Sequence, residues 1–245
     1  MNNLIIDFGN TYKKIALERN GNIFFTHQYV DFSINEIQEL EKEYSFQRVI
    51  MSSVLTADRE LENYLKAKCF FIKVSHKTFL PIANQYETPK TLGTDRLACV
   101  VAAHQLYPKS DCLVVQMGSC ITYDFINQKG EYKGGSISPG LQMRYKALHA
   151  FTKKLPHLKS QTIEGIIGKT TQESIHIGVN NGIIQEANGV INQYENKYKF
   201  LKVLVTGGDS PMFEDKFQHK IILQPNLVTL GLSAILTYNN NERNS

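Results

Sequence analysis

The chain has 245 residues, 42% of them hydrophobic and 20% charged, which excludes a disordered or fibrous protein. Its net charge of +4 suits a small anionic substrate and does not argue for nucleic acid. No apolar run approaches the roughly 18 residues of a membrane span and no secretion signal opens the sequence. We therefore expect a cytoplasmic protein that binds neither membrane nor nucleic acid.

The first half of the sequence alternates strand and helix patterns. Apolar runs predict strands at 3–8, 12–18, 22–30, 48–54 and 70–74. Ser33 and Glu36 have the spacing of a capping box and predict a helix that ends near residue 44. The segment 81–89 is expected to be a loop. Apolar residues at helical spacing follow it, with Thr94 as the expected N-cap.

The pattern then restarts. Three strands joined by tight turns are expected between residues 112 and 137, and later strands at 200–206 and 221–225. Helices are expected to begin at Pro139, at Thr170 or Thr171, and at residue 226. The polar stretch 239–245 is expected to be disordered.

The restart aligns with the first half. When Leu4 is placed on Leu113 with no gap, four pairs of glycine or polar residues are also aligned. The aligned pairs are Asp7 with Gln116, Gly9 with Gly118, Asn10 with Ser119, and Gly21 with Gly130. The simplest account is a duplicated α/β domain with two facing hairpins, although glycine turns can also coincide by chance. We expect domains at 1–110 and 111–238.

Two such turns could hold a polyphosphate. A glycine lets the backbone approach an anion, and consecutive N–H groups then point at it. Thr11 and Ser119 would add hydroxyl donors. Asp7 beside phosphates would repel them unless a cation intervenes, so it implies Mg²⁺ bound through water. The alternative is that these residues only form ordinary hairpin turns.

The segment "GTDR" at 93–96 is a second candidate site. Asp95 suits the first turn of a helix, but Arg96 is unfavourable there unless an anion lies close. A substrate carboxylate or phosphate would explain the pair. "GIIGKTT" at 165–171 resembles a P-loop but has Ile163 where the pattern needs glycine, so we reject it. The four cysteines have no metal-ligand spacing and predict no zinc site.

Several segments, in one order from Ile5 to Leu236, resemble type III pantothenate kinase, a family of the acetate/sugar kinase, heat-shock ATPase and actin superfamily. They are "DFGNT", "YETPKTLGTDR", "GSCITYD", "GGSISPG", "GKTTQESIHIGV", "VTGGDSP" and "LVTLGL". The resemblance implies two actin-like, ribonuclease H-like α/β domains with a nucleotide cleft between them. It also implies ATP-dependent phosphorylation of pantothenate, the first step of coenzyme A synthesis, by a homodimer.

The resemblance also implies roles for individual residues. Asp95 would be the general base, and Asp7 would face Mg²⁺. ATP would be bound by Asp7, Phe8, Gly9, Asn10, Thr11, Tyr12, Lys13, Lys14 and Ser119. Pantothenate would be bound by Tyr86, Gly93, Thr94, Asp95, Arg96 and Thr171.

One position departs from the family pattern. The second phosphate motif normally starts with an aspartate that binds a monovalent cation, K⁺ or NH₄⁺, and here that residue is Gln116. We expect weakened cation binding, with Asp124 facing elsewhere. Gln116 also leaves open the alternative that the chain is a non-catalytic regulatory or accessory relative of the same family. A kinase of another small hydroxy acid is a third possibility.

Overall fold

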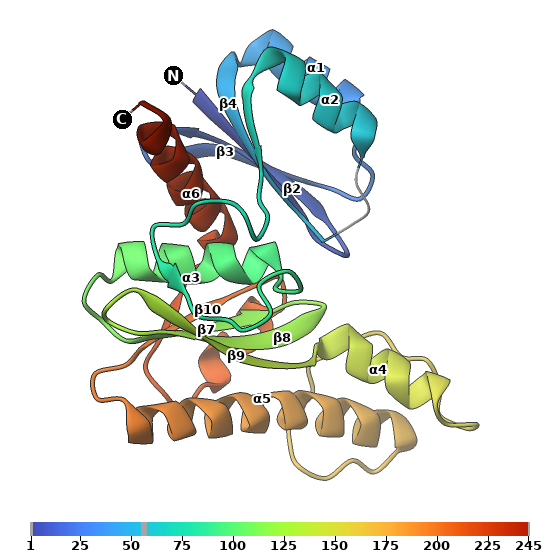
Figure 1. The fold of residues 1–245 in the computed structure, drawn as a ribbon. Helices are drawn as coiled ribbons and strands as arrows, with labels where there is room; N and C mark the ends of the chain where they lie inside the picture. The colour runs from blue at the N-terminus through green and yellow to red at the C-terminus, as the bar shows by residue number, and fades with distance from the viewer. Residues whose placement is uncertain (1, 55–57, 245) are drawn as a thin grey trace. The chain divides into compact units, whose positions relative to one another are not determined.

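The computed structural model describes residues 2–54 and 58–244, the last three by their backbone alone, and it forms two compact α/β units (Figure 1). Unit 1 comprises Met1–Pro108, Gly130–Tyr132 and Asn226–Ser245, and unit 2 comprises Lys109–Lys129 and Lys133–Pro225. Among the helices described, none is long and apolar enough to cross a membrane.

Unit 1 is built on a five-stranded sheet of order β3-β2-β1-β4-β5. Its strands are β1 (Asn2–Phe8), β2 (Lys13–Arg19), β3 (Asn22–Tyr29), β4 (Phe46–Ser53) and β5 (Phe70–Lys73). Helices α1 (Ile34–Glu43) and α2 (Arg59–Lys68) pack on the face that presents Leu4 and Ile6. Helices α3 (Thr94–Leu106) and α6 (Leu227–Asn244) pack on the opposite face, around Ile5.

The face of this sheet toward α3 and α6 carries three rows of side chains. Strand pairing places residues of β2, β1 and β4 side by side, because register partners point to the same face. The rows are Glu18–Asn3–Arg48, Ala16–Ile5–Ile50 and Lys14–Asp7–Ser52. An apolar row therefore separates two polar rows at opposite ends of β1.

Unit 2 repeats this topology. Its strands run in the order β11-β10-β7-β8-β9, and β10 is parallel to both β7 and β11. They are β7 (Cys112–Met117), β8 (Cys120–Ile126), β9 (Glu131–Pro139), β10 (Lys202–Thr206) and β11 (Ile221–Leu223). The short β6 (Ala83–Asn84) pairs with the first residues of β9, which belong to unit 1. The core of unit 2 lies between its sheet and α5 (Thr171–Lys197).

The matching strand order supports a duplication, but the ungapped alignment is out of register by one residue where β2 and β8 begin. Pairing of β1 with β2 ends at Phe8 and Lys13, whereas pairing of β7 with β8 ends at Met117 and Ile121. The second turn is therefore one residue shorter than the first. Gly21 and Gly130 nevertheless share a positive φ, of 83° and 76°.

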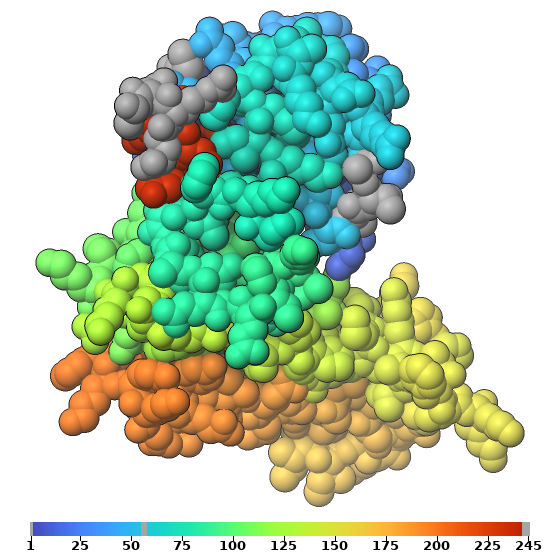
Figure 2. Space-filling view, in the orientation of Figure 1, coloured from blue at the N-terminus to red at the C-terminus, as the bar shows by residue number. Residues whose placement is uncertain are grey.

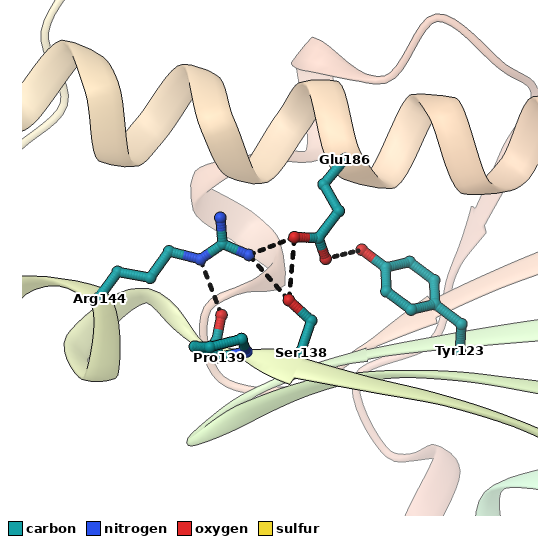
Figure 3. Close-up of polar contacts among 5 residues, drawn as sticks. All are labelled: Tyr123, Ser138, Pro139, Arg144 and Glu186. Atoms are coloured by element: carbon teal, nitrogen blue, oxygen red, sulfur yellow. Dashed lines mark hydrogen bonds and ion pairs between the residues drawn. The ribbon is translucent and has the colours of Figure 1, made fainter. Parts of the chain in front are cut away.

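A polar network joins α4 (Leu141–Ala150) to α5 and to the sheet of unit 2 (Figure 3). Glu186 on α5 pairs with Arg144 at 2.5 Å and accepts hydrogen bonds from Ser138 and Tyr123, each at 2.9 Å. Arg144 also donates to the Pro139 carbonyl at 2.8 Å. Burial raises the pKa of Glu186, but these hydrogen bonds outweigh it and hold that pKa below its usual value.

Several expected elements differ in the structure. Thr94 is not the N-cap of α3, because Gly93 occupies that position without a side-chain cap. Pro139 ends β9, and α4 begins after Gly140. Residues 239–244 continue α6, so a disordered tail is wrong for them, and Ser245 lies outside the described residues. Because α6 packs on β1 and α3, it belongs to unit 1 rather than to the later half of the chain.

Candidate active site

The first part of the candidate site is the turn between β1 and β2. The Gly9 N–H donates to the Tyr12 carbonyl at 3.1 Å, which closes the turn. Asn10, Thr11 and Tyr12 are exposed, and Gly9 is partly buried. The turn thus presents a glycine backbone, an amide and a hydroxyl beside the end of β1, as the phosphate-loop interpretation requires.

Asp7 lies at this end of β1, in one row with Lys14 and Ser52. Burial, and after it the negative charge of Asp95, raises the pKa of Asp7 from 3.8 to about 7. A hydrogen bond with Ser52 and the charge of Lys14 oppose that rise. Lys14 donates from Nζ to Asn226 Oδ1 at 2.7 Å, and burial lowers its pKa although Asp7 opposes this.

The Asp7–Asp95 pair fits a divalent cation. A carboxylate whose pKa is raised by a neighbouring negative charge is stabilised in its ionised form by a cation placed beside it. Mg²⁺ is usually held by one or two carboxylates together with water and substrate phosphates. Within the described residues, no cluster of three or more His, Cys, Asp or Glu could hold a metal by itself. The pair therefore fits a metal that arrives with a nucleotide.

The first turn of α3 forms the second part of the site in unit 1. An alanine at position 93 would place its Cβ 2.6 Å from Asp95 Oδ1, so the carboxylate packs directly against Gly93. The hydroxyl oxygens of Thr94 and Ser52 are 2.9 Å apart, which ties this turn to β4. Asp95 is thereby held on the same side of the sheet as Asp7.

Arg96 and Tyr86 lie against one another. The Arg96 guanidinium carbon is 5.7 Å from the centre of the Tyr86 ring, although Arg96 is only 5% exposed. Tyr86 stacks on the buried Tyr132, with ring centres 6.1 Å apart and planes 11° apart. A buried guanidinium on an aromatic wall can bind a carboxylate through two parallel hydrogen bonds.

In unit 2, three loops converge on the end of β7. A Cβ at Gly140 would lie 2.0 Å from the Gly118 carbonyl oxygen, and one at Gly207 would lie 2.1 Å from the Met117 oxygen. Only glycine permits these contacts, and Gly207 also has a φ of 100°. Ser119 is exposed at the tip. The sequence predicted the turn at 118–119 but carried no signal that Gly140 and Gly207 pack closely against it.

The neighbourhood of Gln116 offers neutral oxygen atoms. Gln116 pairs in register with Thr122, whose buried hydroxyl oxygen has no hydrogen-bond partner among the described residues. Asp124 pairs with Val114, one row further along the same face, so the expectation that it faces elsewhere is wrong. An uncharged amide at 116 beside a free hydroxyl oxygen fits weak rather than strong cation binding.

Thr171 lies apart from these groups in the sequence and belongs to unit 2. It is the first residue of α5, after a capping box formed by Thr170 and Glu173. Its side chain lines a cavity of about 700 Å³ between α4 and α5, together with Leu148 and Val179. The sequence carried no signal for this apolar cavity.

Solved structures define the fold class of the chain. The chain has the two-unit α/β fold of actin-like ATPases and sugar kinases. A protein from Campylobacter jejuni described as a conserved Baf family transcriptional activator matches with a TM-score of 0.60 at 23% identity, covering 97% of this chain and 99% of the other. An activator of 2-hydroxyisocaproyl-CoA dehydratase from Clostridium difficile, with bound ADPNP, gives 0.55 at 12% identity over 100% and 98%. These likenesses show the fold alone.

The sequence shows the family. Residues 3–193 match the type III pantothenate kinase family. A type III pantothenate kinase of Phocaeicola vulgatus is 41% identical, over 97% of this chain and 98% of its own. One from Christiangramia forsetii is 39% identical, with the same coverage. The chain belongs to the type III pantothenate kinase family, which is a family of enzymes.

Proposed function

We propose that this chain transfers the terminal phosphoryl group of ATP to the hydroxyl of pantothenate and so makes 4′-phosphopantothenate for coenzyme A synthesis. The family supports this activity. The observation that carries it here is the placement of Asp95 close enough to Asp7 for its charge to raise the Asp7 pKa. The carboxylate proposed for the acceptor side and the one proposed for the metal side thus interact through their charges.

On the acceptor side, Asp95 is the proposed general base. Phosphoryl transfer needs mainly positioning and charge neutralisation, so a carboxylate that accepts the hydroxyl proton suffices. Arg96 would hold the pantothenate carboxylate, and Tyr86, Gly93 and Thr94 would line the pocket. Contact between Gly93 and the Asp95 carboxylate fixes the position of the base. Thr171 is proposed as a further substrate contact.

On the nucleotide side, the turn of each unit would contact ATP. In unit 1 the contacts would come from Asp7 through Lys14, and in unit 2 from Ser119. When bound, Mg²⁺ would neutralise phosphate charge, with Asp7 and water holding it. The Gly9 backbone would approach the phosphates closely because no Cβ intervenes.

Pantothenate-dependent release of ADP tests the proposal. We expect turnover with ATP, Mg²⁺ and pantothenate, and little ADP without pantothenate. A panel of other small hydroxy acids serves as the specificity control. Turnover with one of those acids but not pantothenate would favour a different small-acid kinase. If the chain binds nucleotide but phosphorylates none of these acids, the result would favour a non-catalytic, accessory role.

We also propose a homodimer, formed through the face around α4 and α5. Phe151 lines the apolar cavity between these helices and is 88% exposed. Ile166 and Ile167 are also strongly exposed and follow Gly165, whose carbonyl accepts a hydrogen bond from Asn181 of α5. The end of α4 and the chain after it project from unit 2 (Figure 2). Exposed apolar side chains beside an apolar cavity favour a dimer in which a second copy of the chain covers them.

A further inference from the structure

The polar network around Glu186 reaches the turn at 118–119 of unit 2 through a single peptide group. Arg144 donates from Nε to the Pro139 carbonyl oxygen at 2.8 Å (Figure 3). The N–H of the same peptide group, which belongs to Gly140, donates to the Ser119 carbonyl oxygen at 3.2 Å. This peptide is trans, so its C=O and N–H point in opposite directions and join Arg144 on one side to Ser119 on the other.

The peptide group is packed against the turn without slack. A Cβ at Gly140 would lie 2.0 Å from the Gly118 carbonyl oxygen and 2.6 Å from that of Ser119. Interiors packed this closely transmit small displacements instead of absorbing them. A rotation of the peptide plane therefore either moves the turn or breaks the hydrogen bond to Ser119. The direction of the Pro139 carbonyl and the position of the turn are consequently linked.

Glu186 of α5 in turn fixes Arg144. The donors of a guanidinium lie in one plane at fixed angles. One terminal nitrogen of Arg144 is 2.5 Å from Glu186 Oε2 and 2.9 Å from Ser138 Oγ, and this leaves Nε aimed at the Pro139 carbonyl. The other carboxylate oxygen accepts from the hydroxyl of Tyr123, which is 1% exposed. Both oxygens of Glu186 are thus held by partners on the sheet and on α4.

The charges of the network are suited to orienting a peptide group. The hydrogen bonds to Glu186 hold its pKa below the usual value, so the carboxylate is ionised at neutral pH. Hydrogen bonds in a series that begins at a charge polarise one another. A partly buried ion pair adds little stability once desolvation is counted. An ion pair that only held α4 against α5 would not need the bond from Arg144 to the Pro139 carbonyl.

We propose that Glu186 is a positioning residue for the nucleotide turn of unit 2. Through Arg144 and the Pro139–Gly140 peptide, it sets the direction of the Ser119 carbonyl and with it the shape of the turn that contacts ATP. The inference rests on the proposed contact between Ser119 and ATP. Neither Glu186 nor Arg144 needs to touch the nucleotide. All of these residues belong to unit 2.

Glu186→Gln tests the proposal. The amide keeps the size of the side chain but cannot accept from both Arg144 and Tyr123, because its nitrogen only donates. We expect kcat/KM for ATP to fall about 10- to 100-fold, with the KM for pantothenate unchanged within about twofold. Calorimetry without pantothenate should show weaker binding of a non-hydrolysable ATP analogue with Mg²⁺. The control is Glu195→Gln on the same helix, which removes the pairing with His219 at 2.7 Å and should change none of these values.

Arg144→Lys separates the geometry of the guanidinium from its charge and serves if Glu186→Gln does not fold. A lysine can keep the ion pair with Glu186, but its single nitrogen does not reproduce the fork that also bonds the Pro139 carbonyl. We expect the same weakening of the ATP analogue. In the double variant the losses should not add, because the two residues act on one peptide group.

The binding measurement separates this proposal from the proposed activity. A wild type that binds the analogue but does not turn over pantothenate would refute the kinase proposal alone. Unchanged affinity for the analogue in folded Glu186→Gln, or equal loss in Glu195→Gln, would overturn the positioning role. Because Arg144 also lines the cavity between α4 and α5, light scattering should give the same mass for Glu186→Gln as for the wild type. A changed mass would assign the network to assembly and overturn the proposal.

Discussion

At the scale of single residues, Asp95 has the most specific proposed role. Its carboxylate lies against Gly93 at the start of α3 and acts on Asp7 through its charge. Asp95→Asn keeps the shape and removes the base. We expect kcat to fall about 100- to 10,000-fold with a small change in the KM for pantothenate. Steady-state ADP release measures both, and near-normal kcat would remove Asp95 from the base role.

Asp7 links protonation to stability. Its pKa is about 7 in the folded protein against an ordinary 3.8, so the folded state binds this proton more tightly. The free energy of unfolding therefore falls as pH rises through that interval, and the loss is complete above it. Without metal, Asp7→Asn should gain stability over wild type at pH 8, by about 2–4 kcal/mol, and little at pH 4.5.

Urea unfolding in EDTA at both pH values checks this prediction. The amide introduced by Asp7→Asn cannot ionise, so the variant and the wild type should diverge only as Asp7 loses its proton. A stability difference that is the same at pH 4.5 and pH 8 would contradict the argument. The pair of measurements also separates charge from packing, because a packing defect would not depend on pH.

Gln116 sets the proposed cation dependence. With an amide at this position and a free Thr122 hydroxyl oxygen beside it, we expect turnover to change less than about twofold when KCl replaces NaCl at constant ionic strength. Gln116→Asp restores a charged ligand and should increase activation by K⁺. Strong K⁺ activation of the wild type would show that the amide binds the ion well.

At the scale of elements, local sequence signals predicted what they directly determine. The Ser33–Glu36 capping box and the Thr170 helix start are both present. Helix α2 was missed because its polar sequence, RELENYLKAK, buries few side chains. The extension of α6 through "NNNERN" has no sequence signal, because Asn is a poor helix former.

The candidate site was only partly visible in the sequence for the same reason. The turns at Gly9 and Gly118 and the Asp95–Arg96 pair carry local patterns. Ser52 and Asn226 do not, and they join Asp7 and Lys14 only through strand pairing and the placement of α6. Thr94 was expected as a cap, but its hydroxyl contacts Ser52 of β4 instead. Contacts between distant segments are decided by packing, which a local pattern does not encode.

The crossing of α3 and α6 gives a test of packing. A Cβ at Gly231 would lie 1.8 Å from the Ala98 carbonyl oxygen, so Gly231→Ala must push the helices apart. We expect a loss of about 2 kcal/mol or more in the free energy of unfolding. Gly189→Ala on α5, where a Cβ meets open space, is the control and should gain up to about 1 kcal/mol. Equal effects in urea unfolding would argue against a tight crossing.

At the scale of the whole molecule, the repeated strand order is the strongest evidence for duplication. In each sheet the first strand pairs with an antiparallel strand on one side (β1 with β2, β7 with β8), and two successive parallel strands follow on the other (β4 and β5, β10 and β11). This arrangement is independent of which turn residues coincide in an alignment. The domain limits 1–110 and 111–238 stay a prediction about that duplication, whereas the compact units assign α6 to unit 1.

The proposed dimer is tested by mass in solution. Light scattering after size exclusion should give twice the chain mass for the wild type, because isolated chains would leave Phe151 and the hollow beside it in water. Phe151→Asp should shift the population toward the single chain. Phe200→Asp is the matched control, since Phe200 is 94% exposed but follows α5 at its far end. Burial of one large apolar side chain contributes about 2 kcal/mol on each subunit, so its loss in Phe151→Asp should weaken the dimer measurably. If the dimer survives Phe151→Asp, or if Phe200→Asp dissociates it equally, the interface lies elsewhere.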